Sequence, residues 1–194
     1  MKSLVVSALT VLLCLTGCGG GSDVLREDGN VSSALSDTNL LKTGQTKMYV
    51  EGDDGYYQKG ISRSYSRDDA KRIVIDRVTN LMWQDDANAT VTKTFQEAVD
   101  FCQNLELGGF SDWKLPNIYE LVSLVEYGKL RPSIDAVFQH IANKNYWSAT
   151  HSARNLAKVK FVSFETGIVS VVSETYDSYG GLHFRCVRNA GEER

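Results

Sequence analysis

The sequence predicts an α+β domain in which two helices pack on antiparallel strands. Two segments near the middle of the 194-residue chain place apolar residues three and four positions apart, which is the period of an amphipathic helix. The segments before and after them alternate apolar with polar residues, which is the period of a strand with one buried face. A strand region, two consecutive helices and a second strand region are typical of the α+β class.

Residues 1–17 have the features of a bacterial lipoprotein signal peptide. A charged start precedes an apolar run that is too short to span a bilayer. The run ends in Leu-Thr-Gly-Cys at residues 15–18, the pattern at which bacteria attach diacylglycerol, with fatty acids such as palmitate, to the cysteine. We therefore expect a membrane anchor at Cys18. Gly19 follows it, which favours the outer membrane of a Gram-negative cell envelope.

Residues 18–45 are expected to form a flexible, disordered tether after the lipidated cysteine. They are rich in Gly, Ser, Asp and Asn and have no apolar period, so they cannot bury a core. The remaining residues, 46–194, have the size of one domain.

The first part of this domain predicts a hairpin followed by a helix. Residues 72–84 alternate β-branched and apolar residues on both sides of a turn, in which Asn80 is the residue that tolerates positive φ. Thr94 and Glu97 then have the spacing of a capping box, and apolar residues follow at helical spacing. The glycines at 108–109 are expected to end this helix.

A second helix is predicted to start after Asn117. Glu120 lies three residues further on, which again gives a capping box, and Gly128 is the expected terminator. Residues 108–117, with the sequence GGFSDWKLPN, are therefore the joint between the two helices.

The C-terminal half predicts several antiparallel strands. Residues 131–138 are expected to form a short turn or helix before them. Gly167 is the candidate for the left-handed position of a hairpin loop. The strand-like segments are residues 145–150, 157–164, 168–173 and 183–189.

The cysteines predict one disulfide. Cys14 is removed with the signal peptide and Cys18 carries lipid, which leaves Cys102 and Cys186. In an oxidising envelope an isolated pair is expected to be bonded. Here the bond would join the first helix to the last strand and, in the chain-entropy model, stabilise the fold by about 4 to 5 kcal/mol at most.

The charge of the chain argues against nucleic acid as a partner. The formal net charge is −3, and loss of Lys2 with the signal peptide makes it −4. Without basic clusters or arginine-rich helices, the protein lacks the positive surface that nucleic acids require.

Five blocks occur in order between residues 73 and 188 of this chain: TNLMWQ, FQEAVDFCQNLELGGFSDWKLPNIYELVSLV, YWSAT, VSFETGIV and FRCVR. Together they resemble the C-terminal domain family of the Legionella collagen-like adhesin. Asn80, Lys114 and Ala149 stand where the family pattern has Gly, Arg and Ser, and these three changes are mild.

The resemblance implies a C-type-lectin-like fold, related to that of formylglycine-generating enzymes, in an extracytoplasmic setting. For the adhesin after which the family is named, the resemblance also implies binding to sulfated glycans as a trimer. This chain has no collagen repeats of the kind that help to assemble that trimer, so its oligomeric state is left open.

Three residues are candidates for contacting a ligand. Tyr146, His151 and Tyr179 are expected in or near loops, where recognition residues concentrate. Trp113 and Trp147 also suit sugar stacking, but tryptophans beside a helix joint or within an alternating strand favour the core.

No metal site is predicted. The histidines at 140, 151 and 183 lack the spacing of zinc ligands. Asp85, Asp86 and Asn88 offer oxygens to calcium, but they lack the spaced ligands of an EF-hand, so we expect a solvated acidic loop.

The sequence favours a non-enzymatic protein without a cofactor and without catalytic residues. It contains no nucleophile elbow, P-loop or dinucleotide fingerprint. We expect an envelope lipoprotein that binds an extracellular glycan or a surface protein in adhesion. One alternative is a structural or assembly lipoprotein that docks on an envelope protein complex. A second is a formylglycine-generating-like oxidase, which would need reactive thiols rather than a disulfide.

Overall fold

A computed structural model describes residues 40–191 of the chain. The expected signal peptide, the expected lipidation site at Cys18 and most of the expected tether lie outside the described residues. Across the described part, no helix is both long enough and apolar enough to cross a bilayer.

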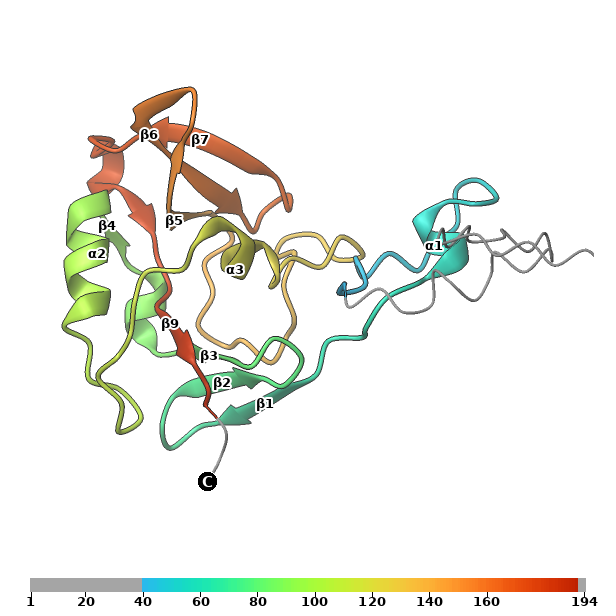
Figure 1. Cartoon of the computed structure of the whole chain (residues 1–194), viewed down its shortest axis with the longest axis horizontal. Coiled ribbons are helices and arrows are strands. Elements are labelled where there is room, and N and C mark those ends of the chain that lie inside the picture. The colour runs from blue at the N-terminus through green and yellow to red at the C-terminus, as the bar shows by residue number, and fades with distance from the viewer. Residues whose placement is uncertain (1–39, 192–194) are drawn as a thin grey trace, which may run out of the picture.

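The fold is a mixed α+β arrangement dominated by strands, with few helices (Figure 1). The helix α2 stands beside the strands at one end of the molecule, and a small lobe with α1 projects from the other end. The helical elements are α1 (Asp54–Tyr57), η1 (Ala87–Thr90), α2 (Phe95–Gln103), α3 (Ile118–Val122) and η2 (Ser178–Gly180). The strands are β1 (Tyr65–Asp68), β2 (Ile73–Asp76), β3 (Leu81–Gln84), β4 (Thr92–Lys93), β5 (Asn145–Ser152), β6 (Asn155–Ser163), β7 (Val169–Ser173), β8 (Leu182–His183) and β9 (Val187–Asn189).

The strands form two sheets. The smaller sheet has the order β1-β2-β3-β9, and the larger has the order β4-β8-β5-β6-β7. All pairings are antiparallel except the short contact between β5 and β8. The larger sheet therefore places β4, which directly precedes α2, next to β8 near the C-terminal end of the domain.

The predicted first hairpin is confirmed as β2 and β3. Asn80 has a φ of 56°, as its place in the turn requires. The Asp76 carboxylate accepts hydrogen bonds from the backbone N–H groups of Val78 and Thr79, at 2.9 and 3.2 Å. An aspartate that bonds the backbone just ahead of it is a common way to close a turn.

The capping box of α2 is present, but the expected end of the helix is wrong. Thr94 and Glu97 cap each other's backbone, and the helix ends at Gln103, before the two glycines. The Asn104 side chain donates to the Asp100 carbonyl at 2.7 Å, so an asparagine closes the last turn. The glycines at 108–109 instead form a tight turn with positive φ in the loop that follows.

The second helix also starts where the capping box predicts and ends earlier than expected. The Asn117 side chain accepts from two backbone N–H groups, and α3 ends at Val122 rather than near Gly128. The Arg63 guanidinium donates to the carbonyls of Ser123 and Val125, at 3.0 and 2.5 Å. Because these carbonyls accept from another segment of the chain, the helical bonding pattern does not continue through them.

The joint between the helices has a structural role. The Trp113 indole is buried and donates to the Phe110 carbonyl at 3.1 Å. The Arg188 guanidinium lies 3.9 Å from the centroid of the Phe110 ring. The loop is thus fixed on the smaller sheet, and the expected place of Trp113 in the core is confirmed.

The C-terminal strands follow the prediction with one difference. Gly167 has a φ of 75° and closes the β6–β7 hairpin as expected. The expected continuous strand at 183–189 is instead two strands, β8 and β9, which belong to different sheets. Of the two alternatives for residues 131–138, the structure has the turn: they form turns and bends.

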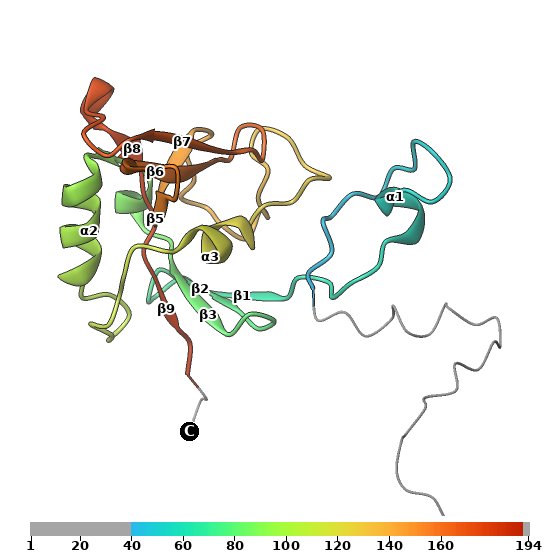
Figure 2. The same ribbon diagram turned by 45° about the horizontal axis from the view of Figure 1, so that its top comes forward.

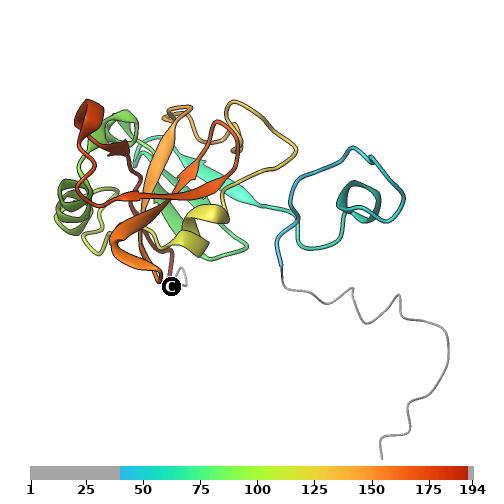
Figure 3. The same cartoon turned by 90° about the horizontal axis from the view of Figure 1, so that it is seen from above.

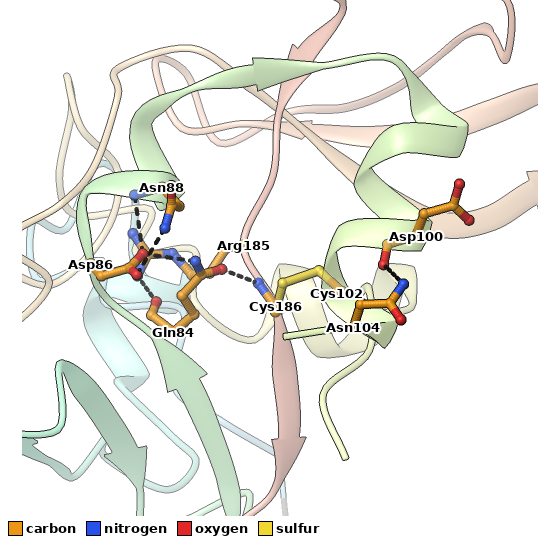
Figure 4. Close-up of a disulfide and its surroundings, with 8 residues drawn as sticks. All are labelled: Gln84, Asp86, Asn88, Asp100, Cys102, Asn104, Arg185 and Cys186. Carbon is orange, nitrogen blue, oxygen red and sulfur yellow. Dashed lines mark hydrogen bonds between the residues drawn. A yellow bond between two sulfur atoms is a disulfide. The ribbon is translucent and has the colours of Figure 1, made fainter. Parts of the chain in front are cut away.

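The disulfide between Cys102 and Cys186 is present (Figure 4). Both cysteines are fully buried. Beside the bond, the Gln84 side chain accepts from the Cys186 backbone N–H at 3.0 Å. The bond joins α2 to the chain between β8 and β9, so it ties the helix to the point where the backbone passes from one sheet to the other.

The larger sheet separates two apolar clusters. Tyr146 packs in one cluster with Leu121 and Phe164, and Trp147 packs in the other with Ala98 and the disulfide. Successive residues of a strand point to opposite faces, so the first half of β5, at Tyr146 to Ser148, is buried on both sides. The expected core position of Trp147 is confirmed.

The described structure also shows bonds to residues that the sequence assigns to the tether. Leu41 forms a β-bridge with Ile61. The Thr43 carbonyl accepts from the backbone N–H of Tyr127 at 2.8 Å. Residues 41–45 are therefore part of the packed structure, because partners distant in sequence satisfy their backbone groups.

Candidate functional site

A pocket of about 380 Å³ lies at the end of the larger sheet, between β4, β8 and the η2 loop. Its volume is within the range of sites for small ligands. The lining residues are Thr92, Lys144, Asn145, Tyr176, Ser178, Tyr179, Gly181, Leu182 and His183.

The sequence Ser-Tyr-Gly-Gly-Leu forms the loop on one side of this pocket. Tyr179 adopts a left-handed backbone with a φ of 58°, and its carbonyl accepts from the Thr92 hydroxyl at 3.1 Å. Gly181 has a φ of 92°, and a Cβ atom there would lie 1.9 Å from the Lys93 carbonyl oxygen. Only glycine permits so close an approach. The loop therefore holds the Tyr179 side chain out into solvent, 96% exposed.

A buried ion pair fixes the segment that brings Lys144 to the pocket. Asp85 and Arg185 are both fully buried, and Nη1 of the arginine lies 2.8 Å from Oδ1 of the aspartate. The Asp85 carboxylate also accepts from the backbone N–H groups of Gln139 and His140, at 2.9 and 3.2 Å. A buried charge pair is stable only when its remaining hydrogen-bonding capacity is satisfied in this way. The anchored backbone then continues to Lys144.

His183 forms part of the pocket from β8. Burial lowers the pKa of its imidazole below the usual value. Hydrogen bonds with the backbone of residues 90–91 raise this pKa in part, and the nearby charge of Lys144 lowers it. The ring stacks on Tyr146 with 5.4 Å between centroids. His183 is therefore a neutral, firmly supported wall of the pocket at neutral pH.

The pocket combines one cation with aromatic and amide groups. Lys144 is exposed and forms no ion pair with any of the described residues, and no carboxylate lines the pocket. Tyr176 and Tyr179 offer ring faces and hydroxyls, and Asn145 offers an amide. An aromatic face suits the apolar face of a sugar ring, and an unpaired ammonium suits a sulfate or carboxylate. The arrangement can bind a polar, anionic ligand, and it presents no activated nucleophile.

The three predicted ligand residues have different positions. Tyr179 lines the pocket, as its loop position suggested. Tyr146 and His151 both lie within β5, close to its two ends and so to the loops that flank the strand. Tyr146 is fully buried, and its hydroxyl donates to the Ala89 carbonyl at 3.0 Å. The Tyr146 ring, fixed in this way, supports the His183 ring that stacks on it. His151 is outside the pocket, and its Nε2 lies 3.2 Å from the Glu174 carboxylate.

Sequence reasoning missed Lys144, Asn145 and His183. The first two directly precede the YWSAT block, and only the fold brings them beside β8. The available signal was the run of polar residues Asn-Lys-Asn at 143–145 before an apolar strand, which is typical of a loop at a strand edge.

The expected solvated acidic loop at residues 85–88 is wrong. Asp85 is in the buried pair with Arg185, and Asp86 is almost fully buried. The Asp86 carboxylate accepts from the backbone N–H of Asn88 at 3.0 Å and from the Gln84 amide at 2.7 Å (Figure 4). These oxygens already have donors from the protein. Among the described residues, no group of three or more His, Cys, Asp or Glu side chains is placed to hold a metal ion.

A larger pocket of about 490 Å³ lies on the outer face of the smaller sheet. Its floor is mostly aliphatic, with Ile75 and Met82, and its rim carries both signs of charge. There the Lys71 ammonium is 3.9 Å from the Asp68 carboxylate. The charges on this rim partly neutralise each other, and none of the predicted ligand residues is present. We therefore assign the candidate site to the pocket around Tyr179.

Comparison with known proteins supports the order of sequence blocks described above. A search of curated proteins found no relative that matches the chain. The family model of the Lcl C-terminal domain matches residues 72–188, which include the β2–β3 hairpin, the helices α2 and α3, the disulfide and the pocket. This match covers more than half of the chain, and the chain therefore belongs to the Lcl C-terminal domain family.

Proposed function

We propose that this chain is a non-enzymatic lipoprotein of the cell envelope, anchored at Cys18, that binds an extracellular glycan in adhesion. The family is consistent with adhesion in the broad sense. The observation that carries the finer proposal is the pocket itself, which joins the exposed Tyr179 ring to the unpaired Lys144 ammonium without any carboxylate in its lining. Such a lining favours sulfated or carboxylated sugars.

The proposal includes a C-type-lectin-like fold for the domain. Two helices beside antiparallel strands, with a disulfide between a helix and the C-terminal strands, are compatible with that fold. The disulfide also supports a binding function over an oxidase, because a bonded cysteine has no thiolate to react. We place the protein in the outer membrane on the basis of Gly19, and a trimer is open to test by sedimentation.

Heparin is a suitable probe, with chemically desulfated heparin as its control. We expect the purified protein to bind heparin, and Lys144→Gln and Tyr179→Ser each to weaken binding by roughly tenfold, the loss that follows removal of one good polar or stacking contact. Lys158→Gln is the matched control, since Lys158 is an exposed lysine on β6 outside the pocket.

The proposal fails if the control weakens heparin binding as much as Lys144→Gln, because binding would then depend on overall charge. It also fails if a panel of sulfated, carboxylated and neutral glycans gives no binding at any ionic strength. Binding that is equal for heparin and its desulfated form would remove the role proposed for Lys144.

A second function, docking on an envelope protein, is favoured by the edge of the larger sheet. β7 is an edge strand, and Ile168, Val169 and Val171 are exposed on or beside it. An exposed apolar edge is a common site for pairing with another chain. Crosslinking on intact cells distinguishes the two functions: docking predicts one constant protein neighbour, whereas adhesion predicts none.

A further inference from the structure

Residues 46–59 form a small lobe that stands apart from the two sheets (Figures 1 and 2). The lobe contains α1 and lies at one end of the long axis, and α2 and β8 lie at the other end in both views. Arg63 fixes its root by donating to the Lys42 carbonyl at 2.7 Å and to carbonyls in the segment after α3. The lobe is thus joined to the rest of the domain by defined hydrogen bonds at its root.

The interior of the lobe is held together by polar and backbone contacts. The Asp53 carboxylate accepts three backbone hydrogen bonds, of 2.8 to 3.3 Å, from Tyr49, Val50 and Tyr56. At Gly55 a Cβ atom would lie 2.1 Å from the Lys47 carbonyl oxygen, so the chain crosses itself at a point where only glycine fits. This packing leaves no apolar core within the lobe.

The large apolar side chains of the lobe face outward instead. Five of them are between 49% and 73% exposed, and they are Met48, Tyr49, Val50, Tyr56 and Tyr57. Single exposed apolar residues are common on protein surfaces, but a group of this size on one small projection indicates contact with a partner or a membrane.

We propose that this lobe contacts the lipid bilayer and places its tyrosines in the interfacial region of the membrane. The inference rests on the proposed lipid anchor at Cys18. The tether that follows this cysteine enters the described structure at the root of the lobe, through residues 41–45. The lobe is therefore the part of the domain that directly follows the tether.

The chemistry of the lobe fits a bilayer interface. Tyrosine has an apolar ring and a polar hydroxyl, which is why it is enriched where lipid tails meet headgroups. The ammonium groups of Lys47 and Lys59 lie 4.7 and 5.1 Å from the ring centroids of Tyr49 and Tyr57. Lysines in this position can extend to the headgroups while their stems cover apolar surface.

The charge of the lobe indicates the kind of lipid. Residues 46–59 contain two lysines and three acidic residues, so the lobe has no net positive charge to attract anionic lipid. Apolar contact is then the main attraction, and binding to zwitterionic vesicles should change little with salt.

This contact would also orient the site. The lobe and the η2–β8 side of the larger sheet lie at opposite ends of the molecule in all three views (Figures 1 to 3). With the lobe on the bilayer, the pocket around Tyr179 faces away from the membrane, toward ligands outside.

The test uses the full acylated protein in phosphatidylcholine vesicles. The Tyr57→Cys variant is labelled with a fluorophore, and lipids brominated along the acyl chain serve as the quencher. The Tyr119→Cys variant is the matched control, since Tyr119 is an exposed tyrosine outside the lobe. We expect strong quenching at position 57, equal at low and high salt, and little at position 119.

Removing the neighbouring rings supplies the second measurement. We expect Tyr49→Ser together with Tyr56→Ser to reduce quenching at position 57 severalfold, since burial of even one large apolar side chain changes an equilibrium constant by about tenfold. Tyr127→Ser together with Leu156→Ser, at two exposed sites elsewhere, should leave it unchanged. Thermal melts establish that each variant is folded.

The outcomes separate the lobe from the anchor. If the protein floats with the vesicles but the label at position 57 remains in water, the lobe proposal is wrong and the anchor stands. If the label is shielded yet insensitive to brominated lipid, a second copy or another protein covers the lobe, and the proposal is also wrong. If the protein does not float, the anchor itself fails, and the lobe proposal falls with it.

Discussion

Replacing Asp85 with asparagine tests the buried ion pair that supports the candidate site. Asp85→Asn retains the size of the side chain but removes its charge, and it leaves the fully buried Arg185 without its carboxylate. The partly buried Arg67, which also pairs with Asp85, loses a partner as well. Because breaking a buried pair leaves an uncompensated charge, we expect the free energy of unfolding to fall by about 3 to 5 kcal/mol.

The pH dependence of this loss provides its signature. Burial alone would raise the pKa of Asp85, but the charge and hydrogen bonds of Arg185, with those of Gln139 and Arg67, outweigh burial and hold the pKa below its usual value. A carboxylate with a lowered folded-state pKa stabilises the fold above its unfolded pKa of about 3.9, and this contribution is lost as the pH falls through the folded value. The difference between wild type and variant should be constant from about pH 5 to 8 and should narrow below about pH 4.

Urea unfolding followed by circular dichroism measures both quantities. Asp86→Asn is the matched control, because Asp86 is nearly buried but caps η1 without an arginine partner. Asparagine caps helices as well as aspartate does, so this variant should lose much less stability. The reasoning is refuted if Asp85→Asn costs less than about 1 kcal/mol, or if the difference widens as the pH falls below 4.

Substitutions at three further features test separate parts of the structure. Cys102→Ala and Cys186→Ala should lower the melting temperature by similar amounts. The melting temperature of the double variant should fall no further than that of either single variant, because one bond accounts for both losses. Additive losses in scanning calorimetry would contradict the pairing. Gly181→Ala should lower the unfolding free energy by about 1 to 3 kcal/mol in urea titrations, since its Cβ would collide with the Lys93 carbonyl; an unchanged value would show that the loop can shift. Asn80→Val should cost about 1 to 2 kcal/mol because a β-branched residue disfavours the positive φ of the turn, whereas Asn80→Gly should be nearly neutral, and equal losses for the two would contradict that reason.

The sequence predicts the local features of the fold well where neighbouring residues determine them. Both capping boxes, the positive φ of Asn80 and the glycine of the β6–β7 hairpin are present as expected. These features depend on bonds between groups three or four residues apart, so their physical cause lies within the segment itself. The Cys102–Cys186 disulfide was also predictable, because an expected lipoprotein signal and an expected oxidising compartment left these two cysteines to pair.

The helix ends and the divided final strand required the tertiary structure. The chain after α3 bonds to Arg63, about sixty residues earlier in the sequence, and no local pattern indicates such a partner. The segment at 183–189 has the alternation of one strand, but β8 and β9 pair with different sheets. Pairing partners distant in sequence decide where a strand stops.

The candidate site depended still more on the fold. Tyr179 was accessible to sequence reasoning because a tyrosine before two glycines indicates an exposed loop. Lys144 and His183 lie about forty residues apart in the sequence and line the same pocket only because β5 and β8 are neighbours. The burial of Asp85 could not be predicted from the sequence either, since two adjacent acidic residues occur both in solvated loops and in buried ion pairs.

By itself, the sequence determined the α+β class, the caps and turns, the cysteine pair and the family, because each depends on short-range patterns or on residue identity. Only the tertiary structure decided which polar residues are buried, where the helices stop and which side chains line one pocket. The physical reason is that burial and charge pairing depend on distances in space, which two residues far apart in the chain acquire only when the sheets assemble.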